Sequence, residues 1–275
     1  MRRAFTQPMT RNAWAILALI LLAFSISAWA TKPLIDFHVF HTAATRALGG
    51  EALYRESDGD MPFKYAPVIA ILIAPMGSIP ERAAAFLWLV ATALLLIRFI
   101  DYARARYFPE APVWATALVV FFVLHFHRHL LELGQCDVLI LALAAESEIQ
   151  RARRPLLSGA LLALTCLFKP PFLLFAALAL LFREGKRLAA FGAALAVGAV
   201  VPILRYGFDG NLEQLHAWRE TLARTTSPMF CALDNQSVFG LVCRYLAPAE
   251  SSGAGAARRR GDRPAATCSG RRDRR

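Results

Sequence analysis

The sequence predicts an all-α protein that crosses a membrane several times. Hydrophobic residues make up 57% of the 275 residues and charged residues only 19%, whereas a soluble domain has roughly 45–50% and 25%. These apolar residues fill whole segments, several of them near the roughly 20 residues that a helix needs to cross a bilayer. Because lipid offers no hydrogen bonds to the backbone, such segments must be helical. The composition also excludes a disordered chain.

The first predicted span is the apolar run from Ala13 to Ala30. Arg2, Arg3 and Arg11 precede it, so the positive-inside rule places the N-terminus in the cytoplasm. A signal peptide is the alternative, because Ala28-Trp29-Ala30 fits a cleavage site. The apolar run is longer than the core of a typical signal peptide. We therefore expect an uncleaved first span.

Further apolar runs bring the expected number of spans to seven or eight. Lys169-Pro170-Pro171 interrupts one of these runs, and we expect a hairpin there because proline removes backbone donors and forces a kink or turn. If this hairpin is counted as two spans, the total is eight. However, the segment after Leu204 can lie outside the cytoplasm only if the number of spans before it is odd. The runs are 65–79, 83–100, 113–131, 138–145, 156–182 and 188–204.

The positive charge is concentrated at the C-terminal end. The net charge is +11, and residues 251–275 hold eight Arg and two Asp, a net +6, which leaves +5 for the rest. This distribution argues against nucleic-acid binding, which needs a basic surface on the folded domain. We expect a membrane-embedded domain over 1–250 and a basic, disordered or frameshifted tail over 251–275. The alternative for the tail is a polybasic segment that binds anionic lipid headgroups.

Three polar residues stand beside or within apolar runs, where ionisable groups are costly and mark sites. Asp36 follows the first span by six residues and is a candidate general base, with a helix cap as the alternative. Gln135 lies between two runs and offers a donor and an acceptor, with a simple turn as the alternative. Lys169 at the proline break needs an anionic partner such as a phosphate, or reaches the interface by snorkelling.

The polar segment after residue 204 adds candidates for substrate contact. Asn235 and Gln236 can hydrogen-bond sugar hydroxyls, and Arg244 can pair with a phosphate in a bidentate manner. A surface loop followed by a capped helix is the alternative. The sequence has no P-loop, no G-x-G-x-x-G and no metal-ligand spacing. We therefore expect neither a cofactor nor a metal.

Taken in order, these segments resemble glycosyltransferase family 87, the DUF2029-type enzymes that use polyprenol-phosphate sugars and include cell-envelope α-mannosyltransferases. The resemblance covers residues 13–248. Phe40 departs from it, since a Tyr often stands there, and family members are typically longer, so the chain resembles a copy truncated at its C-terminal end. The matching segments are Asp36, Gly50 through Tyr54, Phe63-Lys64-Tyr65-Ala66-Pro67, Pro75 to Pro80, Trp88, Gly134-Gln135, Gly159 to Lys169-Pro170, and Asn235-Gln236-Ser237 with Arg244.

This resemblance implies a GT-C-like fold in a bacterial-type inner membrane, with the active site on the outer face. It implies transfer of mannose from a polyprenyl-phosphate donor to an envelope lipid or glycan acceptor, with inversion and Asp36 as the base. The expected partners are that donor, the acceptor and membrane lipid, with no nucleic acid. A multi-span transporter and an inactive truncated fragment remain the alternatives. The substrate contacts it implies are Tyr54, Tyr65, Gln135, Lys169, Asn235, Gln236 and Arg244.

Overall fold

The structure is a computed structural model that describes residues 11–59, 61–226 and 237–246. Helices are the only regular secondary structure in these ranges, which confirms the all-α prediction. The chain divides into two compact units, Met1–Trp218 and Arg219–Arg275, and each is described by itself. The helices are α1 (Arg11–Thr31), α2 (Ile35–Gly49), η2 (Glu56–Asp58), α3 (Pro67–Ile73), η3 (Ala74–Ser78), α4 (Glu81–Tyr107), α5 (Val113–Leu133), α6 (Asp137–Gln150), α7 (Pro155–Phe168), η4 (Pro170–Phe172), α8 (Leu173–Leu181), α9 (Gly185–Thr226) and α10 (Val238–Leu246).

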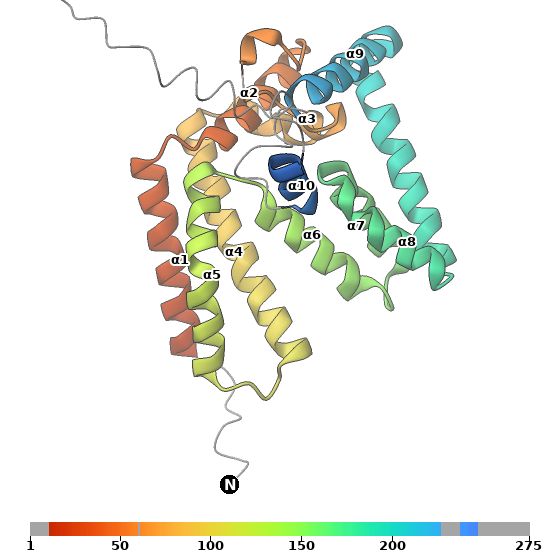
Figure 1. Cartoon of the computed structure of the whole chain (residues 1–275). Coiled ribbons are helices and arrows are strands. Elements are labelled where there is room, and N and C mark those ends of the chain that lie inside the picture. Colours follow the sequence, from red (N-terminus) through yellow and green to blue (C-terminus); the bar gives the residue numbers. More distant parts are fainter. Residues whose placement is uncertain (1–10, 60, 227–236, 247–275) are drawn as a thin grey trace, which may run out of the picture. The chain divides into compact units, whose positions relative to one another are not determined.

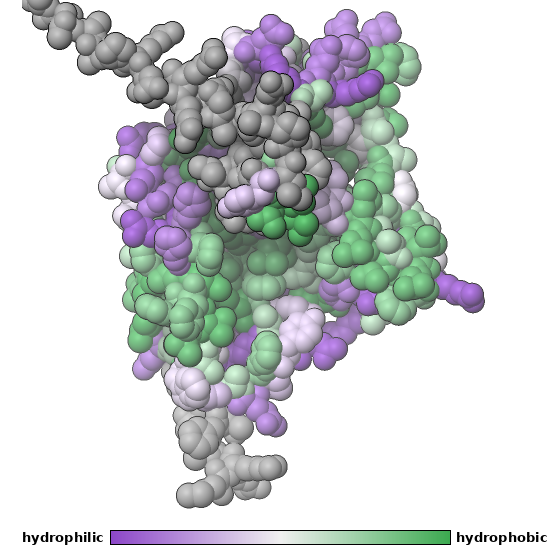
Figure 2. Space-filling view, viewed as in Figure 1, coloured by the Kyte–Doolittle hydropathy of each residue, from purple (hydrophilic) through white to green (hydrophobic). Residues whose placement is uncertain are grey.

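Four helices in the described ranges are long and apolar enough to cross a membrane: α1, α4, α5 and α9. Many of their large apolar side chains face outward; Phe121 and Phe122 of α5, for example, are 69% and 66% exposed. Figure 2 shows apolar side chains along the lengths of the helices and hydrophilic ones toward their ends. Such an apolar exterior suits lipid, so the chain is a polytopic membrane protein. Helices α6, α7 and α8 are shorter, with 14, 14 and 9 residues.

Helices α1, α4 and α5 run side by side, and α1 packs against both of the others (Figure 1). Leu17 and Leu21 of α1 form a buried cluster with Ala93 of α4. The hydroxyl of Ser25 is buried and donates to the carbonyl of Leu21 at 3.0 Å. This bond satisfies a polar group inside a predicted span, as an apolar environment requires.

The apolar run over 65–79 does not form one long helix. It is divided into α3 and η3, and both pack against α2. Pro67 starts α3, while Pro75 and Gly77 lie in the tighter turn of η3. A Cβ on Gly77 would come within 2.6 Å of the Thr45 backbone nitrogen, so only glycine permits this contact. The run is thus a packed support for α2, where the hydropathy of the sequence predicted a span.

The predicted break at Lys169 is present and separates α7 from α8. Helix α7 ends at Phe168, and prolines 170 and 171 begin the short helix η4. Helices α6 and α7 form an antiparallel pair whose connecting turn is held by ion pairs. The buried guanidinium of Arg187, in α9, contacts Glu148 of α6 and Glu184 before α9. These contacts join the turn between α6 and α7 to the turn between α8 and α9.

The connection between α5 and α6 packs directly on α2. Gly134 caps α5 with a positive φ of 72°, which favours glycine. A Cβ at this position would lie 2.6 Å from the Cβ of Phe37. The indole N–H of Trp88, in α4, donates to the Gly134 carbonyl at 3.1 Å. Three helices are therefore joined at one glycine, and residues 135–137 are placed beside the start of α2.

Helix α9 bends at Gly207, whose φ of 72° and ψ of 175° are not helical. Before the bend, the Arg205 guanidinium donates to the Ala47 carbonyl at 2.8 Å and also contacts the Leu48 carbonyl. After it, the side-chain oxygen of Gln214 accepts from the Leu53 N–H at 2.9 Å. The indole N–H of Trp218 donates to the Lys64 carbonyl at 2.9 Å. The bent helix thus holds α2 and both ends of the segment between α2 and α3.

In the second unit, α10 begins after Ser237. The Ser237 hydroxyl accepts a hydrogen bond from the Gly240 N–H at 3.1 Å, which is an N-cap. The capped helix that the sequence left open as an alternative for this segment is therefore present.

We expect Gly134→Ala to destabilise the protein more than Gly50→Ala. Both glycines are in the left-handed helical conformation with a φ of 72°, but a Cβ on Gly50 would come no closer than 3.3 Å, to the flexible end of the Arg205 side chain. The contact with Phe37 should add about 1–3 kcal/mol, the usual cost of overpacking. Thermal unfolding of the two purified variants in detergent measures the difference, and equal midpoints would show that Phe37 moves aside at no cost.

Candidate functional site

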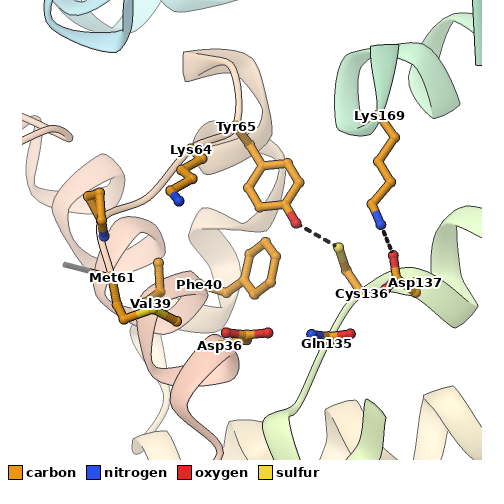
Figure 3. Close-up of a pocket in the computed structure, with 11 residues that line it drawn as sticks. Asp36, Val39, Phe40, Met61, Lys64, Tyr65, Gln135, Cys136, Asp137 and Lys169 are labelled. Carbon is orange, nitrogen blue, oxygen red and sulfur yellow. Dashed lines mark hydrogen bonds and ion pairs between the residues drawn. The ribbon is translucent and has the colours of Figure 1, made fainter. Parts of the chain in front are cut away.

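A pocket of about 210 Å³ opens where α2, the segment before α3, the α5–α6 connection and the end of α7 meet (Figure 3). It brings together four residues that the sequence singled out, Asp36, Tyr65, Gln135 and Lys169. These residues are far apart in the chain and come from four segments. The remaining lining residues are Val39, Phe40, Met61, Pro62, Lys64, Cys136 and Asp137.

Asp36 lies in the first turn of α2, where a carboxylate is stabilised by the helix dipole. The turn is set by Leu34, which has a positive φ of 48°, and by the buried ring of Phe37. Figure 3 shows the carboxylate at the pocket's edge, facing Gln135. Among the described residues it has no hydrogen-bond or ion-pair partner, so both oxygens are available to a ligand.

Tyr65 forms one wall of the pocket, and Tyr54 supports it from behind. The Tyr65 hydroxyl lies 3.3 Å from the Cys136 sulfur, and its ring packs on Phe40 with centroids 5.1 Å apart. Tyr54 does not line the pocket; it lies behind it and donates to the Tyr65 carbonyl at 2.6 Å. Burial is the largest cause that raises the pKa of both phenols, so both stay neutral. They can donate hydrogen bonds but cannot act as bases.

The far side of the pocket carries an ion pair that the sequence did not predict. Asp137, in the first turn of α6, pairs with the amino group of Lys169 at the end of α7. Both side chains remain partly exposed, at 34% and 42%. Lys64 is a further lining residue with a charged side chain, and the sequence gave it no individual role. Its position between Phe63 and Tyr65 in a matching segment was the available signal.

A second ion pair supports the segment behind the pocket. Arg46 of α2 donates to both carboxylate oxygens of Asp58 at 2.7 Å, and to the Leu53 carbonyl at 3.1 Å. The Arg46 guanidinium holds the pKa of Asp58 below its ordinary value. This bidentate contact fixes the segment that carries Tyr54, and Tyr54 in turn fixes Tyr65.

Comparison with known families identifies the chain. The family model of glycosyltransferase family 87 matches residues 63–265. The chain belongs to glycosyltransferase family 87. No curated protein and no solved structure gives a significant match. A family 87 chain is a glycosyltransferase, an enzyme that acts on a sugar donor and an acceptor.

The family match and the pocket overlap only in part. Tyr65, Gln135 and Lys169 lie inside the matched range of family 87, whereas Asp36 lies before it. The role of Asp36 therefore depends on its place in the pocket rather than on the match. Asn235 and Gln236 lie outside the described residues. Arg244 lies in α10 of the second unit, but its side chain is outside the described part of the chain.

We expect Asp58→Asn to lower the unfolding free energy by about 2 kcal/mol at neutral pH, since a bond to a charged group is lost. Because the folded pKa of Asp58 is lowered, its contribution is complete above the ordinary pKa near 4. It is lost as the pH falls through the lowered value. Melting curves of parent and variant should therefore converge as the pH is lowered from 7 to 3.

The control for this experiment is Glu51→Gln, which removes an exposed ion pair with Arg55. Exposed pairs contribute little, so this variant should melt like the parent at every pH. A pH-independent gap between the parent and Asp58→Asn would contradict the assignment.

Cys136 should resist alkylation in the folded protein. It is 2% exposed, and burial raises the pKa of its thiol to about 11. Only the thiolate reacts, so iodoacetamide at pH 8 should modify Cys136 roughly 100-fold more slowly than in the unfolded chain. Peptide mass spectrometry resolves this cysteine from the others, and rapid modification without unfolding would mean that the pocket wall opens.

Proposed function

We propose that this protein transfers mannose from a polyprenyl-phosphate donor to a lipid or glycan acceptor of the cell envelope, with inversion at the anomeric carbon. Membership of family 87 supports sugar transfer. The observation that carries the proposal is the pocket: the Asp36 carboxylate, which has no partner among the described residues, faces side chains that can bind a sugar phosphate. The choice of mannose and of a polyprenyl carrier follows from the resemblance to the mannosyltransferases of this family.

The pocket offers the groups that such a reaction needs. Asp36 has no partner among the described residues and can accept a proton, provided that the acceptor hydroxyl lies within hydrogen-bond reach. Gln135 and Tyr65 line the same space and can hydrogen-bond the sugar. Lys169 brings a positive charge to the far side of the pocket, although its ion pair with Asp137 partly offsets that charge. Tyr54 acts indirectly by holding Tyr65.

In the proposed step, the Asp36 carboxylate takes the proton of the acceptor hydroxyl while that oxygen attacks the anomeric carbon. The new glycosidic bond forms as the bond between the anomeric carbon and the phosphate oxygen breaks. The electron pair of the broken bond stays on the oxygen of the departing polyprenyl phosphate, which thereby gains one negative charge. Cations near the departing oxygen stabilise this charge more in the transition state than in the ground state.

Asn235, Gln236 and Arg244 complete the proposed set of substrate contacts. Their amide and guanidinium groups suit sugar hydroxyls and phosphate oxygens. The resemblance supports their inclusion, since Asn235-Gln236-Ser237 and Arg244 are among the segments that carry it.

We place the protein in a bacterial-type inner membrane, with a cytoplasmic N-terminus and the pocket at the outer face. Helix α6 runs from the pocket at Asp137 to the turn at Arg151, and we propose that it carries the chain from the outer side to the cytoplasmic side. That turn and the basic turn before α9 are joined by the pairing of Arg151 with Glu184. Both turns are basic, which supports a cytoplasmic location. Besides the four long helices α1, α4, α5 and α9, we propose that the shorter helices α6, α7 and α8 also cross the membrane. These seven spans are an odd number, which puts the segment after Leu204 on the outer side with the pocket.

Transfer of radiolabelled mannose from polyprenyl-phosphate-mannose to an envelope lipid extract tests the proposal. Asp36→Asn should lower the rate about 10²–10⁴-fold, the usual contribution of a general base. Glu51→Gln removes a carboxylate outside the pocket and should leave the rate unchanged. If Asp36→Asn transfers label at the parent's rate, Asp36 is not the base.

A further inference from the structure

The four charged side chains that line the pocket comprise one ion pair and two groups that have no ion-pair partner among the described residues. Asp137 and Lys169 form an ion pair, so each offsets the other's charge. Asp36 and Lys64 are the other two charged lining residues, and no ion pair joins them. Among the described residues, the Lys64 amino group has no carboxylate within ion-pair distance. Figure 3 shows it directed into the space lined by Val39 and Phe40.

The backbone that carries Lys64 is held on both sides. Its own carbonyl accepts from the Trp218 indole at 2.9 Å, and the next carbonyl, of Tyr65, accepts from Tyr54 at 2.6 Å. Phe63 is 2% exposed and packs in the core beside it. The side chain of a lysine is flexible even when its backbone is held in place, so the amino group can move with a ligand while the Cα atom does not move.

A cation without a carboxylate partner in a concave, partly apolar site is suited to an anionic ligand. A neutral ion pair attracts such a ligand weakly, because its carboxylate repels what its ammonium attracts. Lys169 would have to release Asp137 to bind an anion fully, whereas Lys64 has no ion pair with a described residue to break. The two lysines of the pocket are therefore not equivalent.

We propose that Lys64 is the residue that binds the phosphate of the donor, and that the Asp137–Lys169 pair shapes the opposite wall. This inference rests on the proposed function and names the residue that binds the phosphate group of the donor. A donor with a phosphodiester carries one negative charge, which one ammonium can match. When the bond to the anomeric carbon breaks, the second charge appears on the phosphate oxygen, and Lys64 stabilises it.

Equilibrium binding of polyprenyl monophosphate to the purified protein in detergent tests this assignment separately from catalysis. Lys64→Met should weaken this binding about 10- to 100-fold, as expected for a hydrogen bond between charged groups. Lys64→Arg should retain most of it, since the positive charge is kept. Polyprenol without phosphate should bind parent and Lys64→Met alike. Lys32→Met is the matched control, because Lys32 lies outside the pocket and pairs with Glu132 at 3.3 Å.

The competing assignment is tested with the double variant Asp137→Asn/Lys169→Met, which removes the ion pair without changing the net charge. It should weaken binding of polyprenyl monophosphate less than Lys64→Met does. The reverse order would overturn the assignment and make Lys169 the phosphate ligand. Inorganic phosphate and phosphatidylglycerol as competitors show whether the site requires the polyprenyl chain or takes any phosphate.

The result for the parent protein distinguishes a failure of the proposed donor from a failure of the role proposed for Lys64. If the parent binds no polyprenyl monophosphate, the proposed donor is wrong. If the parent binds it and Lys64→Met binds it equally well, the donor stands and the role of Lys64 is wrong.

Discussion

The close approach of the Gly134 backbone to Phe37 is the constraint on which the pocket depends. No side chain larger than hydrogen fits between them, since a Cβ would lie 2.6 Å from that of Phe37. The contact sets Asp36, one residue before Phe37, opposite Gln135, one residue after Gly134. Trp88 adds a third helix through its bond to the Gly134 carbonyl. The side chains that face each other in the pocket are thus positioned by backbone contacts immediately beside them.

Around this point the other supports act on backbone carbonyls rather than on the pocket side chains. Trp218 holds the carbonyl of Lys64 and Tyr54 that of Tyr65, while Arg46 holds the carbonyl of Leu53. These supports leave the side chains of Asp36 and Lys64 without a hydrogen-bond or ion-pair partner among the described residues, whereas Asp137 and Lys169 pair with each other. An ion pair between Arg46 and Asp58 contributes to this support without adding charge to the site.

The charge pattern of the pocket favours a reaction that separates charge. Asp36 is available to take a proton, and Lys64 is available to an anion, yet the two do not neutralise each other by direct contact. The proposed transfer requires these two properties in one small volume, because a proton is accepted as negative charge leaves on phosphate. A pocket in which all four charges were paired would serve neither end of the reaction.

The sequence by itself determined the helical membrane class, the break at Lys169 and the polar residues worth testing, because hydropathy, proline and buried charge have local signatures. Asp36, Gln135 and Lys169 could be chosen from the chain in this way and Tyr65 from the resemblance to family 87, and the structure brings the four together. The sequence could not show that residues 67–78 form α3 and η3 packed on α2, because an apolar segment that packs on another helix and one that crosses the membrane have the same composition. Nor could the sequence show that Asp137 pairs with Lys169, or that Lys64 has no ion-pair partner among the described residues. Those outcomes depend on which segments meet in space, and only tertiary packing decides that.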